Sequence, residues 1–200
     1  MANFQSLLFW KIKFIYCANR EISMFKNFIF DVDGVFTDGK FHYSAEGKVF
    51  KVFGDADNDA LSLIREIFHI EMITGDKRGF SISKKRIHDD MGYPISLVST
   101  FERLEWISNR FNLEETIYMG DGIYDPLVFV NVGYSIAPAN AFIHTKQHAR
   151  FVTQSRGGEG AVAEAIVHVL ELIHKTPFDI LKHPKPIKSG TWEMKNPTAQ

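Results

Sequence analysis

The sequence predicts an α/β fold in which a parallel sheet carries helices on both faces. Three observations lead to this prediction. Short apolar runs typical of buried strands alternate along the chain with segments of helical periodicity. Repeated strand–helix alternation favours a parallel sheet. Three of the runs end in a polar residue, at Asp31, Thr74 and Asp121. Because ligands of such sheets bind beyond the carboxyl ends of the strands, we expect these three residues to lie at one site.

The first half of the chain contains five expected elements. An apolar run at residues 27–30 ends at Asp31, as a buried strand would. Two strands, at 40–44 and 48–53, flank Ala45-Glu46-Gly47 and predict a β-hairpin. Residues 57–68 place apolar side chains on one helical face. Residues 70–74 form the next expected strand, which ends at Thr74.

The second half continues the alternation. A helix is expected over 79–91, where the basic run 84–86 indicates a solvated face, and a strand over 95–98. Ser99 and Glu102 have the spacing of a capping box and predict a helix that begins there. Further strands are expected at 116–119, 134–136 and 151–152, and a last helix over 160–174. The length of 200 residues suits one domain with one sizeable core.

The two ends of the chain differ in composition from this domain, which we place at residues 24–175. Residues 1–23 are expected to be an extension, because their apolar run is interrupted by lysines and is too short to span a bilayer. An interfacial helix is the alternative there. Residues 176–200 are rich in proline and lysine and are expected to be an extended or disordered tail.

Composition excludes several classes of function. The net charge of -1 gives no overall basic excess for nucleic acid or an anionic membrane surface. The single cysteine, Cys17, excludes an intramolecular disulfide framework and a CxxC metal site. It fits a reducing, cytoplasmic setting.

The strongest chemical signal is the segment FDVDGVFTDG at residues 30–39. Asp31 and Asp33 leave a strand end together, so one carboxylate can act as a nucleophile beside a second that acts as an acid or base. The alternative is a polar exit from a strand. Thr74-Gly75-Asp76 could bind phosphate oxygens, but alone it is also an ordinary turn. Carboxylates spaced as in the segment 120–125 suit a hard cation such as magnesium, or else a glycine-rich turn with a helix cap.

Together, in this order, these segments resemble the haloacid dehalogenase superfamily of phosphohydrolases over roughly residues 25–173. The resemblance implies a three-layer Rossmann-like fold with a β-hairpin flap and no large cap domain. It implies a Mg²⁺-dependent phosphatase in which Asp31 is the nucleophile and Asp33 the general acid/base. Thr74 would hold the phosphoryl group, and Arg103 would supply the cation of the third motif, with Lys84 and Lys85 as alternatives. The implied magnesium site consists of Asp31, the backbone carbonyl of Asp33, Asp121 and the supporting Asp125.

Within the superfamily the chain is similar to the 3-deoxy-D-manno-octulosonate 8-phosphate phosphatase group, in the stretches DVDGVFTDG, FKVF, PANA and SRGGEGAV. This likeness implies a phosphorylated sugar acid as substrate, with KDO 8-phosphate (the octulosonate 8-phosphate) as the leading example. The implied substrate-binding residues are Gly75, Asp57, Gly157 and Gly158. Small uncapped members are often oligomers whose neighbours close the site, so a homotetramer is expected.

Several positions depart from the group and leave alternatives open. Gly122 stands where the group usually has a second aspartate, and Gly54, Ala56 and Ala163 replace its usual polar residues. The substrate could therefore be 2-keto-3-deoxynononate 9-phosphate or another sugar phosphate. A non-catalytic binding or assembly subunit is the alternative from another class. A phosphotransferase is disfavoured because no cap excludes water.

Overall fold

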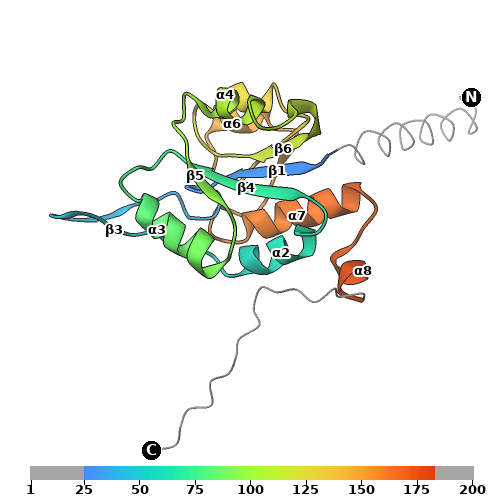
Figure 1. Ribbon diagram of the computed structural model, residues 1–200, viewed down its shortest axis with the longest axis horizontal. Helices are drawn as coiled ribbons and strands as arrows, with labels where there is room; N and C mark the ends of the chain where they lie inside the picture. The colour runs from blue at the N-terminus through green and yellow to red at the C-terminus, as the bar shows by residue number, and fades with distance from the viewer. Residues whose placement is uncertain (1–24, 183–200) are drawn as a thin grey trace, which may run out of the picture.

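The computed structural model describes residues 25–182 of the chain and shows a six-stranded sheet between two layers of helices (Figure 1). The sheet order is β5-β4-β1-β6-β7-β8, and every neighbouring pair is parallel. The strands are β1 (Asn27–Asp31), β4 (His69–Thr74), β5 (Ile95–Leu97), β6 (Thr116–Met119), β7 (Tyr134–Ala137) and β8 (Phe151–Val152). The predicted parallel α/β fold is therefore confirmed.

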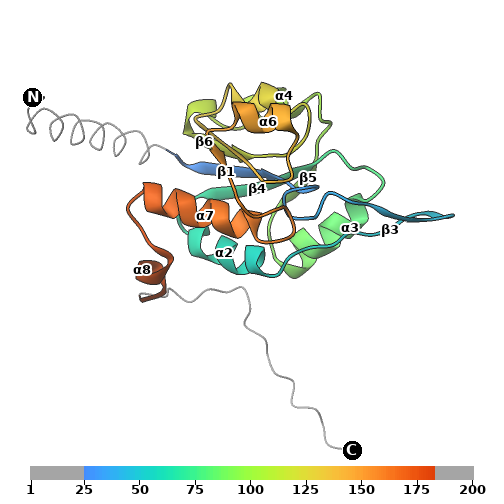
Figure 2. The same ribbon diagram turned by 180° about the vertical axis from the view of Figure 1, so that it is seen from behind.

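The two faces of the sheet carry separate apolar cores. Along β1, Phe28 and Phe30 point into one core and Ile29 into the other, as the two-residue period of a strand requires. The first core is covered by α2 (Ala56–Ile64), α3 (Phe80–Lys84) and α7 (Ala161–Leu172) (Figure 2). The second is covered by α4 (Arg103–Ser108), α5 (Pro126–Phe129) and α6 (Ile143–His148). Burial on both faces explains why the strands are short apolar runs.

A β-hairpin projects from the end of the molecule at which the sheet strands terminate (Figure 1). It consists of β2 (His42–Ser44) and β3 (Gly47–Phe50), which pair antiparallel. The predicted hairpin is confirmed, although its strands are shorter than expected. Many of its apolar side chains are exposed: Phe41, Tyr43, Val49, Phe50 and Val52. Within residues 25–182 nothing covers this apolar surface of the hairpin.

Two helices differ from those that the local sequence predicts. The expected helix 79–91 consists of α3 continued by a π-helix, η1 (Lys85–Asp90). The capping box expected at Ser99 and Glu102 is wrong, because α4 begins at Arg103 without a side-chain cap. Glu102 and Ser99 are joined by a backbone hydrogen bond, and the side chain of Glu102 caps nothing. Arg103, at the first position of the helix, is buried. A 3₁₀ turn, η2 (Leu113–Glu115), precedes β6.

The expected extended tail is corrected at its start, where α8 (Pro177–Lys182) forms a short helix. The Thr176 hydroxyl accepts a hydrogen bond from the backbone N–H of Asp179 at 3.1 Å and donates one to its carboxylate at 2.6 Å. With Pro177 in the first turn, this is a recognisable helix start that composition alone concealed. Ile180 packs against the first core. The expectations for residues 1–23 and 183–200 lie outside the described residues. Among residues 25–182, no helix has the length and apolarity needed to cross a membrane.

Candidate active site

Three neighbouring strands deliver the predicted polar residues to one edge of the sheet. Asp31 ends β1, the strand that lies between β4 and β6. Thr74 ends β4, and Asp121 follows β6 by two residues. Since these strands are parallel and in direct contact, their carboxyl ends meet, as the sequence predicts.

Arg103 binds the Asp31 carboxylate through both of its terminal nitrogens. The Nη1–Oδ2 distance is 2.8 Å and the Nη2–Oδ1 distance is 2.9 Å. Nη1 also donates to Asp125 Oδ1 at 2.8 Å and to the Tyr118 hydroxyl at 3.0 Å. All four side chains are buried. The structure therefore brings Arg103 into the acidic site, whereas Lys84 and Lys85 are exposed, and Lys85 pairs with Asp90 at 3.2 Å.

Asp125 is held by hydrogen bonds to both of its carboxylate oxygens. In addition to Arg103, its Oδ1 accepts the Tyr118 hydroxyl at 2.9 Å, and its Oδ2 accepts the Gly122 N–H at 2.7 Å. Its side chain is completely buried. A side chain at position 122 would begin 3.3 Å from this Oδ2. With glycine at position 122, Asp125 keeps the backbone hydrogen bond from that residue.

The electrostatics of the cluster favour the arrival of a cation. Burial, together with the charges of Asp125 and Asp33, raises the pKa of Asp31 to about 7, although Arg103 opposes the shift. Burial, together with the charges of Asp31 and Asp125, raises the pKa of Asp121 to about 8. Burial would lower the pKa of Arg103, but the charge of Asp31 holds it well above its usual value. One arginine thus leaves the repulsion between these carboxylates only partly compensated.

A hard divalent cation fits this donor set. Asp31, Asp121 and Asp125 each offer a carboxylate oxygen, and these oxygens lie within 4.8 Å of one another. The Asp121 carboxylate lies directly over Gly34, where any Cβ atom would collide with it. Gly34 also has a positive φ of 83°, which favours glycine. Oxygen ligands of this kind suit a hard divalent cation.

The Asp33 carboxylate lies outside this cluster and has its own two partners. Thr74 Oγ1 donates to Asp33 Oδ2 at 2.8 Å, and the Lys51 ammonium lies 2.6 Å from Oδ1. Thr74 Oγ1 also accepts the Asp76 N–H at 3.0 Å. The structure therefore joins Asp33 and Thr74, which were both predicted site residues, and adds Lys51, which the sequence analysis did not single out.

Lys48 of β3 and Lys51, which follows β3, both pair with Asp76. Lys48 forms an ion pair with Asp76 Oδ2, and Lys51 lies 2.8 Å from the same oxygen. Hydrogen bonds from both lysines outweigh burial and lower the pKa of Asp76. Gly79 leaves room for both side chains, since a Cβ there would lie 2.7 Å from the Lys48 stem and 2.8 Å from the Lys51 stem. The hairpin base is thus anchored to the turn after β4.

The loop after β1 is fastened to the glycine-rich segment before α7. Asn140 donates to the Gly34 carbonyl at 2.8 Å and accepts the Gly157 N–H at 2.6 Å. A Cβ at Gly157 would collide with the Gly34 carbonyl, and Gly158 donates to the Val35 carbonyl at 3.3 Å. Gly157 and Gly158 therefore lie against the loop after β1. In the sequence Asn140 stands out only as part of PANA, and its spacing from Gly34 and Gly157 does not predict this bridge.

The position of Asp57 differs from that expected of a substrate contact. Its side chain is 1% exposed and accepts the Ala163 N–H of α7 at 3.0 Å through Oδ1. Burial raises its pKa to about 6. Asp57 therefore joins α2 to the start of α7, whereas Gly75 is exposed beside Thr74.

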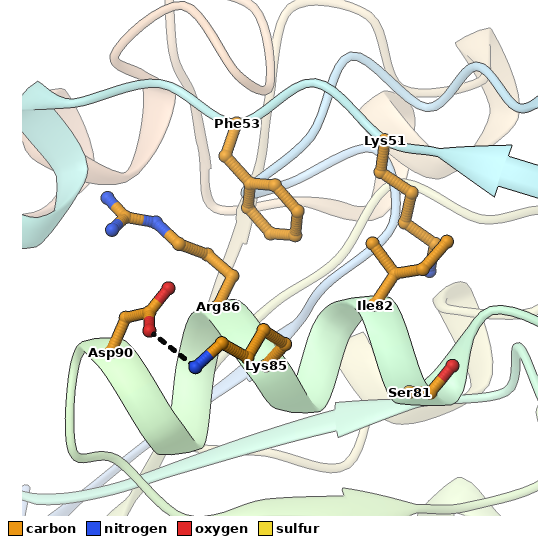
Figure 3. Close-up of a pocket in the computed structure, with 7 residues that line it drawn as sticks. All are labelled: Lys51, Phe53, Ser81, Ile82, Lys85, Arg86 and Asp90. Carbon is orange, nitrogen blue, oxygen red and sulfur yellow. Dashed lines mark ion pairs between the residues drawn. The ribbon is translucent and has the colours of Figure 1, made fainter.

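A cavity of about 420 Å³ lies beside the site, between the chain that follows β3 and the helical segment α3–η1 (Figure 3). Its lining residues are Lys51, Phe53, Ser81, Ile82, Lys85, Arg86 and Asp90. None of the clustered carboxylates lines it. In Figure 3 the Lys51 side chain descends toward Ile82 of α3, and the Lys85 amine reaches Asp90.

The comparisons with known proteins agree with this geometry. A family model described as haloacid dehalogenase-like hydrolase matches residues 102–166. The 3-deoxy-D-manno-octulosonate 8-phosphate phosphatase KdsC of Haemophilus influenzae is 30% identical over 161 residues, covering 76% of this chain and 86% of that protein. The protein of the same name from Yersinia pestis is 31% identical over 141 residues, covering 68% and 74% respectively.

Solved structures show the same fold. The cobalt-bound form of the deoxy-D-mannose-octulosonate 8-phosphate phosphatase of Haemophilus influenzae superposes with a TM-score of 0.66 at 27% sequence identity. The superposition covers 78% of this chain and 93% of that one. The sheet with its two helix layers and this superposition both confirm the predicted three-layer architecture.

Proposed function

The chain belongs to the haloacid dehalogenase-like hydrolases and is a phosphatase, and from this premise we propose that it hydrolyses KDO 8-phosphate with Mg²⁺ through an aspartyl-phosphate. The observation that carries the proposal is the pairing of Asp31 with Arg103 at the carboxyl end of the central strand, beside Asp121. The names of the curated relatives supply the substrate.

In the first step a carboxylate oxygen of Asp31 bonds to phosphorus while the bond from phosphorus to the sugar oxygen breaks. Arg103 holds the carboxylate in place and stabilises negative charge as the transition state forms. Thr74 and the adjacent Gly75 bind phosphoryl oxygens. Asp33, in its protonated form, gives its proton to the leaving sugar oxygen.

In the second step water attacks the phosphorus of the aspartyl-phosphate. Asp33, now a carboxylate, takes the proton of that water, so that the acid of the first step is the base of the second. The bond between phosphorus and Asp31 breaks, which releases inorganic phosphate and restores both aspartates. The Asp33 side chain is partly exposed, whereas that of Asp31 is buried, and this suits the exchange of protons.

The metal site of the proposal consists of Asp31, Asp121 and the backbone carbonyl of Asp33, supported by Asp125. Mg²⁺, when bound, would offset the negative charge that a phosphate ester and these carboxylates bring together. Gly157 and Gly158 contribute by allowing the loop after β1 to approach closely, and Asp57 contributes by holding the start of α7.

A homotetramer is the assembly that we propose for this phosphatase. The exposed apolar side chains of the hairpin support this assembly. Further exposed apolar side chains are Phe101, Ile123, Tyr124, Leu127 and Val130, of which Phe101 and Tyr124 contact each other. Exposed apolar patches are typical of an interface. Light scattering during size-exclusion chromatography tests the assembly, and a monomer of 22.9 kDa at micromolar concentration would contradict it.

Phosphate release is the experiment that tests the proposed reaction. We expect the protein to hydrolyse 4-nitrophenyl phosphate with Mg²⁺, and a chelator to reduce the rate at least about a hundredfold, because the cation supplies several kcal/mol of charge stabilisation. Restoring Mg²⁺ should restore the rate. Hydrolysis that is indifferent to the chelator would contradict the metal-dependent mechanism.

A panel of sugar phosphates then tests the substrate. KDO 8-phosphate should give a higher kcat/KM than 2-keto-3-deoxynononate 9-phosphate or a neutral hexose phosphate. The opposite order would leave the reaction intact and replace the substrate.

A further inference from the structure

Lys51 is a buried cation that the reaction described above does not use. It lies just after β3, and its side chain is completely buried. Its ammonium lies 2.6 Å from Asp33 Oδ1 and 2.8 Å from Asp76 Oδ2, and it donates to the Ser83 hydroxyl at 2.8 Å. Lysines are rarely buried without partners, because the charge loses its hydration. Here two ion pairs and one hydrogen bond compensate the buried charge.

The position of Lys51 fixes both the place and the rotation of the Asp33 carboxylate. Thr74 Oγ1 holds one oxygen of Asp33, and Lys51 holds the other. Lys51 also lies between Asp33 and Asp76, two carboxylates that would otherwise repel each other. Asp76 keeps Lys48 as a second cation, whereas Lys51 is the one cation paired with Asp33 among the described residues.

We propose that Lys51 is the positioning residue of the general acid: it holds Asp33 toward the leaving oxygen of the substrate, between Thr74 on one side and the hairpin base on the other. The proposal rests on the role proposed for Asp33 above. Lys51, which follows the hairpin, thereby takes part in proton transfer by Asp33 of the same chain. An anchor for the hairpin alone would need only Asp76 and Ser83, and it would not require contact with Asp33.

The surroundings of Lys51 keep its ammonium at this place. Its stem passes beside Ile82 and the Phe53 ring at the edge of the cavity (Figure 3). Gly79 leaves the space that the stem occupies. The Phe41 ring lies over Lys48 at 3.3 Å from its ammonium and 5.5 Å from that of Lys51. A buried stem with few alternative rotamers is what precise positioning of a carboxylate requires.

The dependence of the rate on the leaving group distinguishes positioning of the acid from general support of the fold. An alkyl phosphate leaves as a strongly basic alkoxide and needs the proton of Asp33. 4-Nitrophenyl phosphate leaves as a weakly basic phenolate and hardly needs it. A residue that acts through Asp33 must therefore affect the first substrate more than the second.

The test compares Lys51→Met with the parent protein on these two substrates at saturating Mg²⁺. We expect kcat/KM on the sugar phosphate to fall by about 10- to 100-fold, a part of what general acid catalysis contributes. On 4-nitrophenyl phosphate kcat/KM should fall by less than about threefold, because kcat/KM reports the transfer of the phosphoryl group to Asp31 and leaves out the later attack of water, which both substrates share. Lys26→Met, which removes an exposed lysine paired with Glu115 at the other end of β1, is the matched control and should leave both rates unchanged.

Asp33→Asn provides the reference for losing the acid itself. If it shows the selective loss and Lys51→Met slows both substrates by the same factor, the positioning role is overturned and the proposed function stands. If Asp33→Asn shows no selectivity, or the parent protein releases no phosphate, the role of Asp33 fails and the Lys51 proposal fails with it.

A second variant covers the case in which Lys51→Met does not fold. Lys51→Met with Asp76→Asn removes one cation and one carboxylate together, so that no new repulsion with Asp33 arises at the buried site. The same selective loss on the sugar phosphate is expected. Recovery of the parent rate in this double variant would mean that Lys51 only neutralises Asp76, which would overturn the proposal.

Discussion

Asp31→Asn is expected to reduce phosphate release at least about a thousandfold on every substrate, the largest effect of any single substitution in this chain. The amide nitrogen cannot attack phosphorus, and the amide oxygen is a far weaker nucleophile than a carboxylate. Leaving-group basicity should not change this loss, because the attack of Asp31 on phosphorus is common to every substrate. Continuous measurement of released phosphate, with Mg²⁺ present, gives this rate.

The folded state should survive this substitution. Burial raises the pKa of Asp31 to about 7, so the carboxylate costs the native state stability that is lost as pH rises from about 4 to about 7. An asparagine avoids this cost but also loses the ion pair with Arg103. We therefore expect Asp31→Asn to gain thermal stability relative to the parent as the pH is raised from 5 to 8. A variant that is unfolded at pH 8 would make the activity loss uninformative and contradict this electrostatic account.

Two further observations would secure the role of Asp31. Asp55→Asn, a change of the same kind at an exposed helix cap, should keep the parent rate because asparagine also caps helices. Acid quenching of the parent during turnover should leave a phosphoryl group on the peptide that contains Asp31. A labelled peptide that lacks Asp31 would assign the nucleophile elsewhere.

Arg103→Met should have the second largest effect, and it should affect both activity and stability. Removing one partner of a buried ion pair typically costs about 3 to 5 kcal/mol, because the remaining charges stay buried. Here Asp31 and Asp125 would lose their shared cation, and the Tyr118 hydroxyl would lose a hydrogen-bond partner. The rate should fall at least about a hundredfold, since a donor aimed at developing charge is lost.

Mg²⁺ should stabilise Arg103→Met more than it stabilises the parent. A divalent cation would replace part of the missing positive charge, so melting temperatures measured with Mg²⁺ and with a chelator should differ more in the variant. Arg110→Met is the matched control, because Arg110 lies over the Trp106 ring on the exposed end of α4. An equal response to Mg²⁺ in variant and parent would mean that Arg103 does not compensate the carboxylates.

Much of this fold could be predicted from the sequence because its signals are local. Each strand that ends at Asp31, Thr74 or just before Asp121 is a short apolar run, and a parallel sheet necessarily brings such ends together. The helix start at Arg103 and the helix at Pro177–Lys182 were missed for opposite reasons. The first depends on a buried ion pair between residues 72 positions apart, and the second on a cap hidden in a proline-rich segment.

The partners of the general acid could not be predicted. A lysine after an exposed hairpin is expected to be solvated, and only the folded chain places Lys51 against Asp33 and Asp76. Asn140 is a similar case. Its side chain hydrogen-bonds to the backbone of Gly34 and of Gly157, which both lie far from it in sequence. Long-range polar contacts of this kind leave no periodic pattern.

Because of the sheet order, the residues of the proposed reaction and the segments around the substrate lie on different parts of the fold. The reacting groups follow β4, β1 and β6, which are inner strands flanked on both sides, whereas the hairpin and the loop after the outermost strand β8 are held mainly by contacts at their bases. Substitutions in those peripheral segments can therefore change the preferred sugar without altering the spacing of the carboxylates. Related chains could diversify in substrate range while retaining one reaction.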